Sequence, residues 1–195
     1  MIVKLLHATP LEIADKAIGR CWDTETDNPT GRMYRVGNKY KHSSTLEHIN
    51  YTFDIDGISR GCLQELARHR HASMSVKSTR YTLKELKDTP KSELKDFLVL
   101  TGNRFVDEYV NEIVLEDIQD ELRKGTSNDV VKYMLPEAYK TSLVWTINMR
   151  SLQNFLSLRS DKAALAEIQE LARKVFYYLP ETHKFMLEDF VKWQK

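Results

Sequence analysis

The chain has 195 residues and a mass of 22.8 kDa, a length typical of one domain. Its 29 basic and 28 acidic residues leave a formal net charge of +1, which is less basic than is usual for a protein that coats nucleic acid. No apolar run approaches the length of a membrane span, the start of the chain lacks the apolar core of a signal peptide, and the two cysteines form no CxxC pattern. We therefore expect a single domain over residues 1–195 in a reducing compartment, the cytoplasm.

The first elements are short. Residues 1–6 predict a strand, and Thr9 followed by Pro10 predicts a capped helix start, with Cys21 at the end of the apolar stripe of that helix. Residues 23–32 are polar and turn-forming, which predicts a loop.

Residues 49–55 alternate apolar and polar side chains, a period typical of a half-buried strand. We expect Asp56-Gly57 to end this strand. A helix is then indicated by apolar residues at every fourth position: Ile58, Cys62 and Leu66. Residues 71–82 have no periodicity and predict an ordered loop or an irregular strand.

Residues 92–124 have a helical pattern with a break near Gly102 and a stop at Gly125. The second part of this segment carries the apolar stripe Phe105, Tyr109 and Ile113. Ser127 is a candidate cap for a short helix that Pro136 ends.

Residues 139–147 alternate again and predict a second long strand, after which helices are expected from Leu152, over 165–176 and through Trp193. Strands are few, helices are many, and no regular βαβ alternation is present. The pattern predicts an α+β fold, with helices packed around a small antiparallel sheet.

The most unusual stretch of the chain is residues 66–84, which hold five Lys or Arg and no Asp or Glu. Guanidinium groups contact phosphate in a bidentate manner, and hydroxyl groups add neutral donors. In a chain of nearly zero net charge this window indicates an anion site, although charge alone fits a solvated basic face equally well.

The order of residues within the window is more specific. Arg68-His69-Arg70, Ser78 and Arg80 form the pattern RHR-x7-S-x-R, which resembles the signature of the flavin-dependent thymidylate synthases. Upstream, HSSTLEH at 42–48 is similar to that family's H-x-(S/T)-x-x-E-H segment, and downstream WTINMRSLQNFLSLR at 145–159 is similar to its W-T-x-N-x-R-S-L-x-N-F-L-x-L-R block.

The resemblance implies an α+β fold of the thymidylate synthase complementing protein type and a specific reaction. Members of this family methylate dUMP to dTMP, with methylenetetrahydrofolate as carbon donor, FAD as hydride carrier and NADPH as reductant. They act as homotetramers in which several subunits build each FAD site.

The resemblance also implies a role for each matching residue. FAD would contact Ser44, Arg68, His69, Arg70, Asn148, Arg150 and Asn154. The dUMP contacts would be Arg68, Val76, Lys77, Ser78, Thr79, Arg80, Lys132 and Arg159. Ser78 and Arg80 would hold the phosphate. Arg159 would act on the uracil, where a guanidinium stabilises negative charge on the ring and makes C5 more nucleophilic.

Three positions depart from the family pattern. Val76 stands where Glu or Gln is usual, Ala163 where many members have a flavin-contacting His, and Lys132 where some have Arg. Lys132 keeps the charge but lacks the bidentate fork.

Other chemistries were weighed against this one. Cys62 lies on an apolar stripe, so we expect a core residue and not a thiolate nucleophile. Ser78 would need a positioned base to act as a nucleophile, so we favour a binding role. His42, whose segment resembles the family's active-site edge, and the other histidines show no metal-binding spacing, so we expect no metal site.

Two further function classes remain as alternatives. A nucleic-acid-binding module could use residues 66–84, although Tyr81 is the only aromatic residue there and single-strand binders stack bases on several rings. A structural or interaction protein would explain the helices but not the motif.

Overall fold

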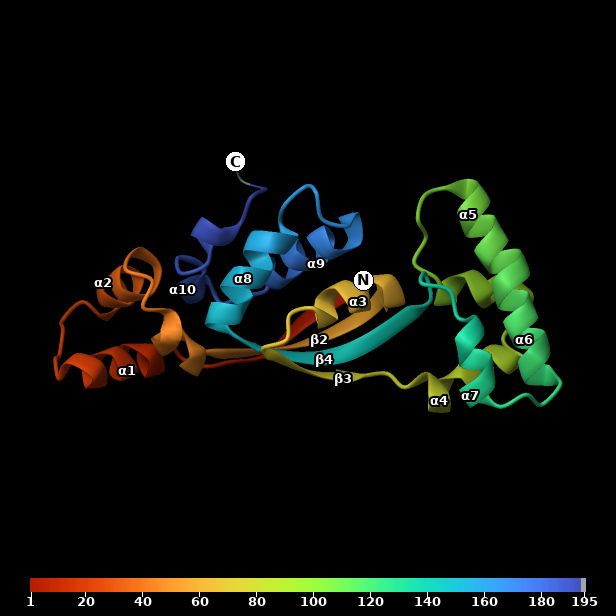
Figure 1. Cartoon of the computed structure of the whole chain (residues 1–195), viewed down its shortest axis with the longest axis horizontal. Helices are drawn as coiled ribbons and strands as arrows, with labels where there is room; N and C mark the ends of the chain where they lie inside the picture. Colours follow the sequence, from red (N-terminus) through yellow and green to blue (C-terminus); the bar gives the residue numbers. More distant parts are fainter. Residues whose placement is uncertain (194–195) are drawn as a thin grey trace. The chain divides into compact units, whose positions relative to one another are not determined.

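The structure, a computed structural model, describes residues 1–193. The chain divides into two compact units (Figure 1). The first unit comprises residues 1–55, 66–75 and the chain from Val144 onward, and the second comprises 56–65 and 76–143.

Four strands form one antiparallel sheet in the order β1-β2-β4-β3. Their bounds are Ile2–Ala8 (β1), Asn50–Ser59 (β2), Ala72–Val76 (β3) and Lys140–Asn148 (β4). The alternation read in β2 is a true burial pattern, since Tyr51, Phe53 and Ile55 are all buried. The predicted α+β fold with a small antiparallel sheet is confirmed.

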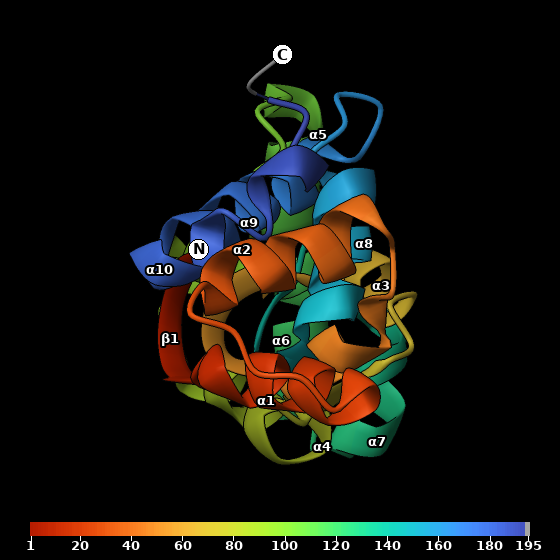
Figure 2. The ribbon, with the colours of Figure 1, turned by 90° about the vertical axis from the view of Figure 1, so that its left-hand side faces the viewer.

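The first unit carries the helices that border β1 and the ends of β2 and β4. They are α1 (Glu12–Trp22), α2 (Pro29–Met33), α8 (Met149–Arg159), α9 (Ala166–Tyr177) and α10 (Glu181–Lys184), with the π-helix η1 (Tyr34–Lys39) and the short 3-10 helices η2 (Ser43–His48) and η7 (Glu188–Phe190). Helix α9 contacts both α8 and β1, and α1 lies beside α2 (Figure 2). The buried Trp145 ring on β4 packs against Phe155 of α8, with the ring centroids 5.1 Å apart.

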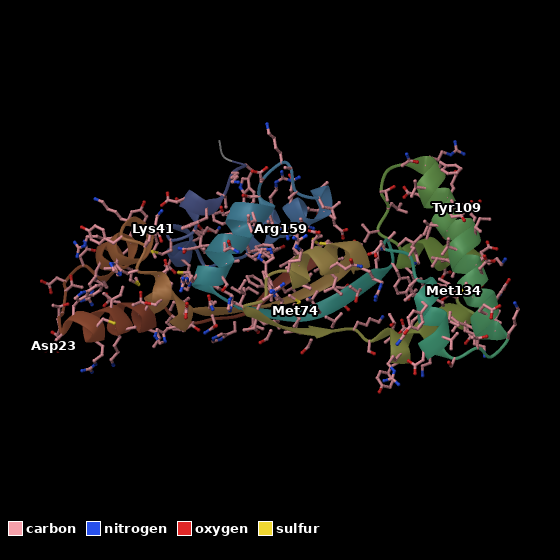
Figure 3. All side chains as sticks on the ribbon, viewed as in Figure 1. Asp23, Lys41, Met74, Tyr109, Met134 and Arg159 are labelled. Atoms are coloured by element: carbon pink, nitrogen blue, oxygen red, sulfur yellow. The ribbon has the colours of Figure 1, made fainter. Side chains whose placement is uncertain are left out.

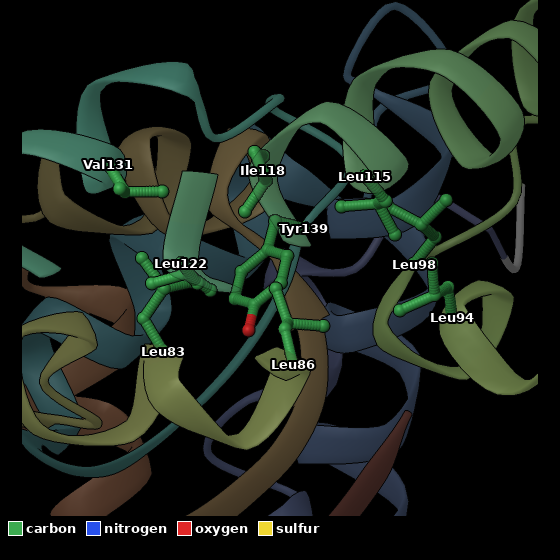
Figure 4. Close-up of a cluster of buried hydrophobic side chains, with 9 residues drawn as sticks. All are labelled: Leu83, Leu86, Leu94, Leu98, Leu115, Ile118, Leu122, Val131 and Tyr139. Atoms are coloured by element: carbon green, nitrogen blue, oxygen red, sulfur yellow. The ribbon is translucent and has the colours of Figure 1, made fainter. Parts of the chain in front are cut away.

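The second unit is mostly helical. Its elements beyond the strands are α3 (Arg60–Ala67, which continues into the first unit), α4 (Thr79–Thr82), η3 (Leu83–Asp88), η4 (Lys91–Phe97), α5 (Arg104–Tyr109), η5 (Val110–Val114), α6 (Leu115–Arg123), α7 (Asn128–Val131) and η6 (Lys132–Met134). Its core is a cluster of nine buried side chains around Tyr139, Ile118 and Leu86 (Figure 4). Desolvation by this burial raises the pKa of Tyr139 to about 12.

Two predictions near the N-terminus are wrong. The first helix starts at Glu12, because Thr9 pairs with the neighbouring strand instead of capping: its amide donates to the Asn50 carbonyl at 2.9 Å and its hydroxyl accepts from the Asn50 amide at 3.2 Å. Cys21, near the end of α1, is exposed, so the buried stripe of Ala14 and Ile18 does not extend to it.

The predicted loop at residues 23–32 ends in a helix. Asn28 accepts from the Gly31 amide at 2.9 Å and caps α2, and Arg32 is held by Asp15 through an ion pair of 2.8 Å. This short helix was not predicted because it begins with Pro, Thr and Gly, which are typical of turns.

The strand predicted to end at Asp56-Gly57 continues to Ser59. Gly57 has a φ of +74°, a conformation that glycine adopts without steric cost, so the chain changes direction there without leaving the sheet. The unperiodic stretch 71–82 contains strand β3 and the single turn α4.

The helical segment after residue 92 is confirmed in outline, with its break near Gly102 and its end at Gly125. Its apolar stripe Phe105, Tyr109 and Ile113 is exposed, however, and only the next turns bury Leu115, Ile118 and Leu122. Ser127 precedes α7 without a side-chain cap bond. The final helix expected through Trp193 is two short turns, α10 and η7. Across residues 1–193, no helix combines the length and apolar character needed to cross a bilayer.

Candidate functional site

A cavity of about 630 Å³ in the first unit brings two of the sequence motifs together. Its walls come from the segment after α3, from the start of α8 and from η2. They are Glu47, Arg68, His69, Arg70, His71, Asn148, Arg150, Ser151 and Asn154. Six of the seven predicted FAD contacts therefore line one cavity. The seventh, Ser44, is exposed on η2 and lines none of the cavities described for the chain.

The RHR segment is fixed at its central histidine. The His69 amide donates to the Leu66 carbonyl at 3.0 Å, and the His69 ring is only 7% exposed and meets the Phe155 ring edge-on at 5.1 Å. With this ring buried, the flanking Arg68 and Arg70 both line the cavity.

His69 also joins the cavity to the residue predicted to act on the uracil. Arg159, at the last turn of α8 (Figure 3), donates from Nε to Nε2 of His69 at 3.0 Å. Because Nε of an arginine is always protonated, Nε2 of His69 is the acceptor.

The first turns of α8 bring side chains of the downstream motif, residues 145–159, to the cavity. Asn148 caps the helix by accepting from the Ser151 amide at 2.9 Å, which puts Arg150 in the first helical turn. Asn154 follows one turn later and reaches the same cavity. Arg150 donates from Nη1 to Oε1 of Glu47 at 2.6 Å.

A second cavity of about 560 Å³ shares Arg68, His69 and Asn154 with the first. Its remaining walls are Leu158, Arg159, Asp161, Ala163, Ala164 and Lys192. Lys192 donates to Asp161 at 2.7 Å, and this bond, together with the Ala163 amide, lowers the pKa of the Asp161 carboxyl. Ala163 adds no polar side chain to this wall.

The predicted dUMP contacts at 76–80 and Lys132 belong to the second unit. There Arg80 makes a two-point bond to Asp129, from Nε at 2.7 Å and from Nη2 at 3.0 Å, and Lys132 lies 3.6 Å from the same carboxylate. These cations, the Arg80 bond first, lower the pKa of Asp129. Arg80 and Lys132 are thus gathered on one carboxylate from segments about fifty residues apart.

Three more of the predicted dUMP contacts in the second unit are Lys77, Ser78 and Val76. Lys77 pairs with Glu85 at 3.1 Å, and its amide donates to the Ser142 carbonyl at 2.8 Å. Ser78 immediately precedes α4, and its carbonyl accepts from the Thr82 amide at 3.2 Å. Val76 is partly exposed at the end of β3.

Several wall residues had no role in the sequence analysis. Glu47, His71 and Ser151 lie inside or beside the quoted motifs. Their closeness to those motifs in the sequence could have identified them as site residues. Asp161 and Lys192 lie outside the motifs, and no spacing in the sequence connects Lys192 to them. Cys62 is buried as predicted. Among residues 1–193, no group of three or more His, Cys, Asp or Glu side chains could hold a metal ion.

The arrangement suits an anionic ligand with a polar ring system. Three arginines face the larger cavity beside asparagine and serine side chains, which offer charged and neutral donors to phosphate oxygens. This donor set fits the pyrophosphate and the flavin ring edge of FAD.

Comparison with known proteins agrees with this chemistry. The family model described as "Thymidylate synthase complementing protein" matches residues 4–183. A flavin-dependent thymidylate synthase of Campylobacter jejuni (strain RM1221) is 52% identical over 200 residues, which cover 96% of each chain. One from Helicobacter pylori (strain ATCC 700392 / 26695) is 46% identical over 202 residues, 95% of this chain and 97% of its own length.

Solved structures give the same result. The crystal structure of a flavin-dependent thymidylate synthase from Helicobacter pylori, complexed with FAD and dUMP, superposes with a TM-score of 0.93 at 46% sequence identity, covering 98% of this chain and 100% of that chain. The family predicted from the motifs is confirmed, and the comparisons give no support to the nucleic-acid-binding alternative. The chain belongs to the thymidylate synthase complementing protein family, the family of the flavin-dependent thymidylate synthases.

Proposed function

We propose that this protein methylates dUMP to dTMP, with methylenetetrahydrofolate as the carbon donor and NADPH as the reductant of a bound FAD. The observation that carries the proposal is the convergence of the RHR segment and the start of α8 on one arginine-rich cavity. Bound FAD supplies the hydride that reduces the transferred carbon to a methyl group, so the folate leaves as tetrahydrofolate.

In this proposal the larger cavity holds FAD. Arg68, Arg70 and Arg150 neutralise the pyrophosphate, because a guanidinium gives two parallel charge-assisted bonds to phosphate. The side chains of His69, Asn148 and Asn154 provide neutral donors and acceptors for the ring edges. Ser44, exposed on η2 and outside this cavity, contacts an FAD that residues of a second subunit also hold.

The dUMP contacts fall into two groups. Ser78 and Arg80, with Lys132, hold the phosphate, which takes the place of the Asp129 carboxylate as the partner of Arg80. Val76, Lys77 and Thr79 contribute backbone groups and short side chains around them. The other two predicted dUMP contacts, Arg68 and Arg159, belong to the first unit, and Arg159 stabilises negative charge that develops on the uracil.

The active form in this proposal is a cytoplasmic homotetramer. Cys21 and Cys62 form no disulfide bond, as is typical of proteins kept in a reducing compartment. Light scattering should give a particle of about four times the 22.8 kDa chain mass. A monomer that is fully active would contradict the shared FAD site.

An anaerobic assay with dUMP, methylenetetrahydrofolate, FAD and NADPH tests the function. We expect dTMP and tetrahydrofolate in equal amounts and no dTMP when FAD is removed. An Arg70→Ala variant should bind less flavin, by roughly 1.5–3 kcal/mol for a lost charged hydrogen bond. Formation of dihydrofolate in place of tetrahydrofolate, or flavin-independent turnover, would contradict the proposal.

A further inference from the structure

A carboxylate lies among the arginines of the larger cavity. Glu47 shares the walls with Arg68, Arg70 and Arg150, although a negative charge repels the phosphates of an anionic ligand. Glu47 is therefore a residue whose presence the binding of an anion alone does not explain.

The backbone brings Glu47 and Arg150 together. Two residues after Glu47, the Ile49 carbonyl accepts from the Met149 amide at 2.8 Å, immediately before Arg150. On the η2 side, Leu46 is fully buried next to Glu47. The 2.6 Å bond between Nη1 of Arg150 and Oε1 of Glu47 thus spans two segments that are already joined by a backbone bond.

The position of Arg150 in α8 explains why it needs a partner. Arg150 is the second residue of this eleven-residue helix, and no acidic residue lies in the first turn. The N-terminus of a helix carries a partial positive charge, so a cation there is unfavourable. Without a carboxylate nearby, the half-exposed Arg150 side chain would turn outward to water.

We propose that Glu47 is a positioning residue for FAD binding: it holds Arg150 by one amino group and so directs the rest of the guanidinium into the cavity. The proposal rests on the assignment of this cavity to FAD. The bond at Nη1 uses one of the five N–H donors of an arginine, and the opposite edge of the planar group is then fixed for two-point contact with a phosphate.

The proposal and simple charge repulsion give opposite signs for one substitution. Glu47→Gln removes a negative charge from an anion-binding cavity with almost no change of shape. Repulsion alone predicts tighter FAD binding in this variant, because the local potential becomes more positive. Positioning predicts weaker binding, because a neutral amide holds the guanidinium less firmly than a carboxylate does.

The experiment is a fluorescence titration of flavin-stripped full-length protein with FAD at fixed ionic strength. We expect Glu47→Gln to raise the Kd for FAD about tenfold, which corresponds to about 1.4 kcal/mol. Glu108→Gln is the matched control, because Glu108 forms a comparable 2.6 Å pair with Arg104 that lines none of the described cavities. It should bind FAD like the wild type.

A double-mutant cycle separates positioning from a general structural effect. If Glu47 acts through Arg150, the Glu47→Gln/Arg150→Gln double variant binds FAD no more weakly than Arg150→Gln alone. Additive losses, or a Glu47→Gln protein that binds FAD as tightly as the wild type or more tightly, would overturn the proposal. A wild-type protein that fails to bind FAD would instead refute the function on which it rests, and the thermal midpoint of each variant shows that it is folded.

Discussion

Three arginines assigned to ligand binding are held by other side chains of the chain. Arg80 bonds to Asp129, Arg150 to Glu47 and Arg159 to His69. The arginine side chain is long and has several rotatable bonds. A side chain that is already held in place loses less conformational entropy when a ligand binds. The roles of these residues therefore depend on partners that the motif letters do not specify.

A pair of substitutions separates binding from chemistry. Arg159→Lys keeps a positive charge but removes the planar fork, together with the Nε that bonds to His69. If Arg159 stabilises charge on the uracil, kcat at saturating dUMP should fall by two to four orders of magnitude, roughly 3–5 kcal/mol. Ser78→Ala should mainly raise the Michaelis constant for dUMP.

Steady-state kinetics on both variants, after their flavin content is matched, decides between the two roles. An Arg159→Lys enzyme of normal turnover beside an inactive Ser78→Ala enzyme that still binds dUMP would reverse the assignment. Such a result would favour a serine nucleophile.

A buried histidine makes stability depend on pH. His183 lies within 2.9 Å of the Tyr51 hydroxyl, and burial lowers the pKa of His183 below its ordinary value of 6.5. As pH drops, His183 is therefore protonated more readily in the unfolded chain than in the folded chain. The free energy of unfolding consequently falls as pH drops below about 6.5. The contribution is complete above that pH.

His183→Gln removes this proton site and keeps a polar side chain for Tyr51. We expect the free energy of unfolding of the wild type to fall more between pH 7.5 and pH 5 than that of the variant, by up to about 1.4 kcal/mol per pH unit within the titration range. Equal pH slopes would show that His183 does not titrate differently on folding. The range ends at pH 5 so that carboxylates such as Asp129 stay ionised.

At the scale of elements, one long helical segment changes character along its length. The stripe Phe105, Tyr109 and Ile113 is exposed, whereas Leu115, Ile118 and Leu122 are buried in the second unit. Between them, η5 (Val110–Val114) is a π-helical turn. Such a turn rotates the following residues relative to a regular α-helix, so a sequence stripe does not continue on one face.

Gln119 marks the buried side of α6. Its Nε2 donates to the Leu86 and Thr89 carbonyls at 2.6 and 2.7 Å, and so ties α6 to the end of η3.

Truncations on the two parts of this segment should differ in cost. Ile118→Ala removes a fully buried side chain and should lower the free energy of unfolding by about 2–5 kcal/mol. Ile113→Ala removes an exposed side chain and should change it by less than about 0.5 kcal/mol. Urea unfolding measures both, and equal losses would contradict the burial described here.

At the scale of the whole molecule, the sheet links the two compact units through the chain itself. Strands β2, β3 and β4 each contribute residues to both units. Separating the units would divide three strands and leave their backbone hydrogen bonds incomplete. We therefore predict one cooperative unfolding transition, as expected for the single domain over residues 1–195.

The tryptophans provide the test. Trp22, Trp145 and Trp193 all belong to the first unit, and Ile118 belongs to the second. If the units unfold together, Ile118→Ala should shift the unfolding midpoint seen by tryptophan fluorescence as much as the midpoint seen by circular dichroism. A shift confined to circular dichroism would show two independent domains.

The family, the fold class and six of the nine residues that line the larger cavity could be predicted from the sequence. The periods of β2 and α9 followed from burial of one face, which acts over a few residues and leaves a local pattern. The motif residues from Arg68 to Arg70 and from Asn148 to Asn154 could be read because their order along the chain is itself specific.

Which distant residues share a cavity wall becomes visible only in the folded chain. Thr9 pairs with Asn50 instead of capping a helix, Glu47 meets Arg150, and Lys192 reaches the cavity of Arg159. These contacts join residues from about thirty to more than a hundred positions apart, and no periodicity in one segment records the partner that lies across the fold. The physical reason is that local patterns reflect burial and backbone geometry, whereas a site depends on where folding brings separate segments together.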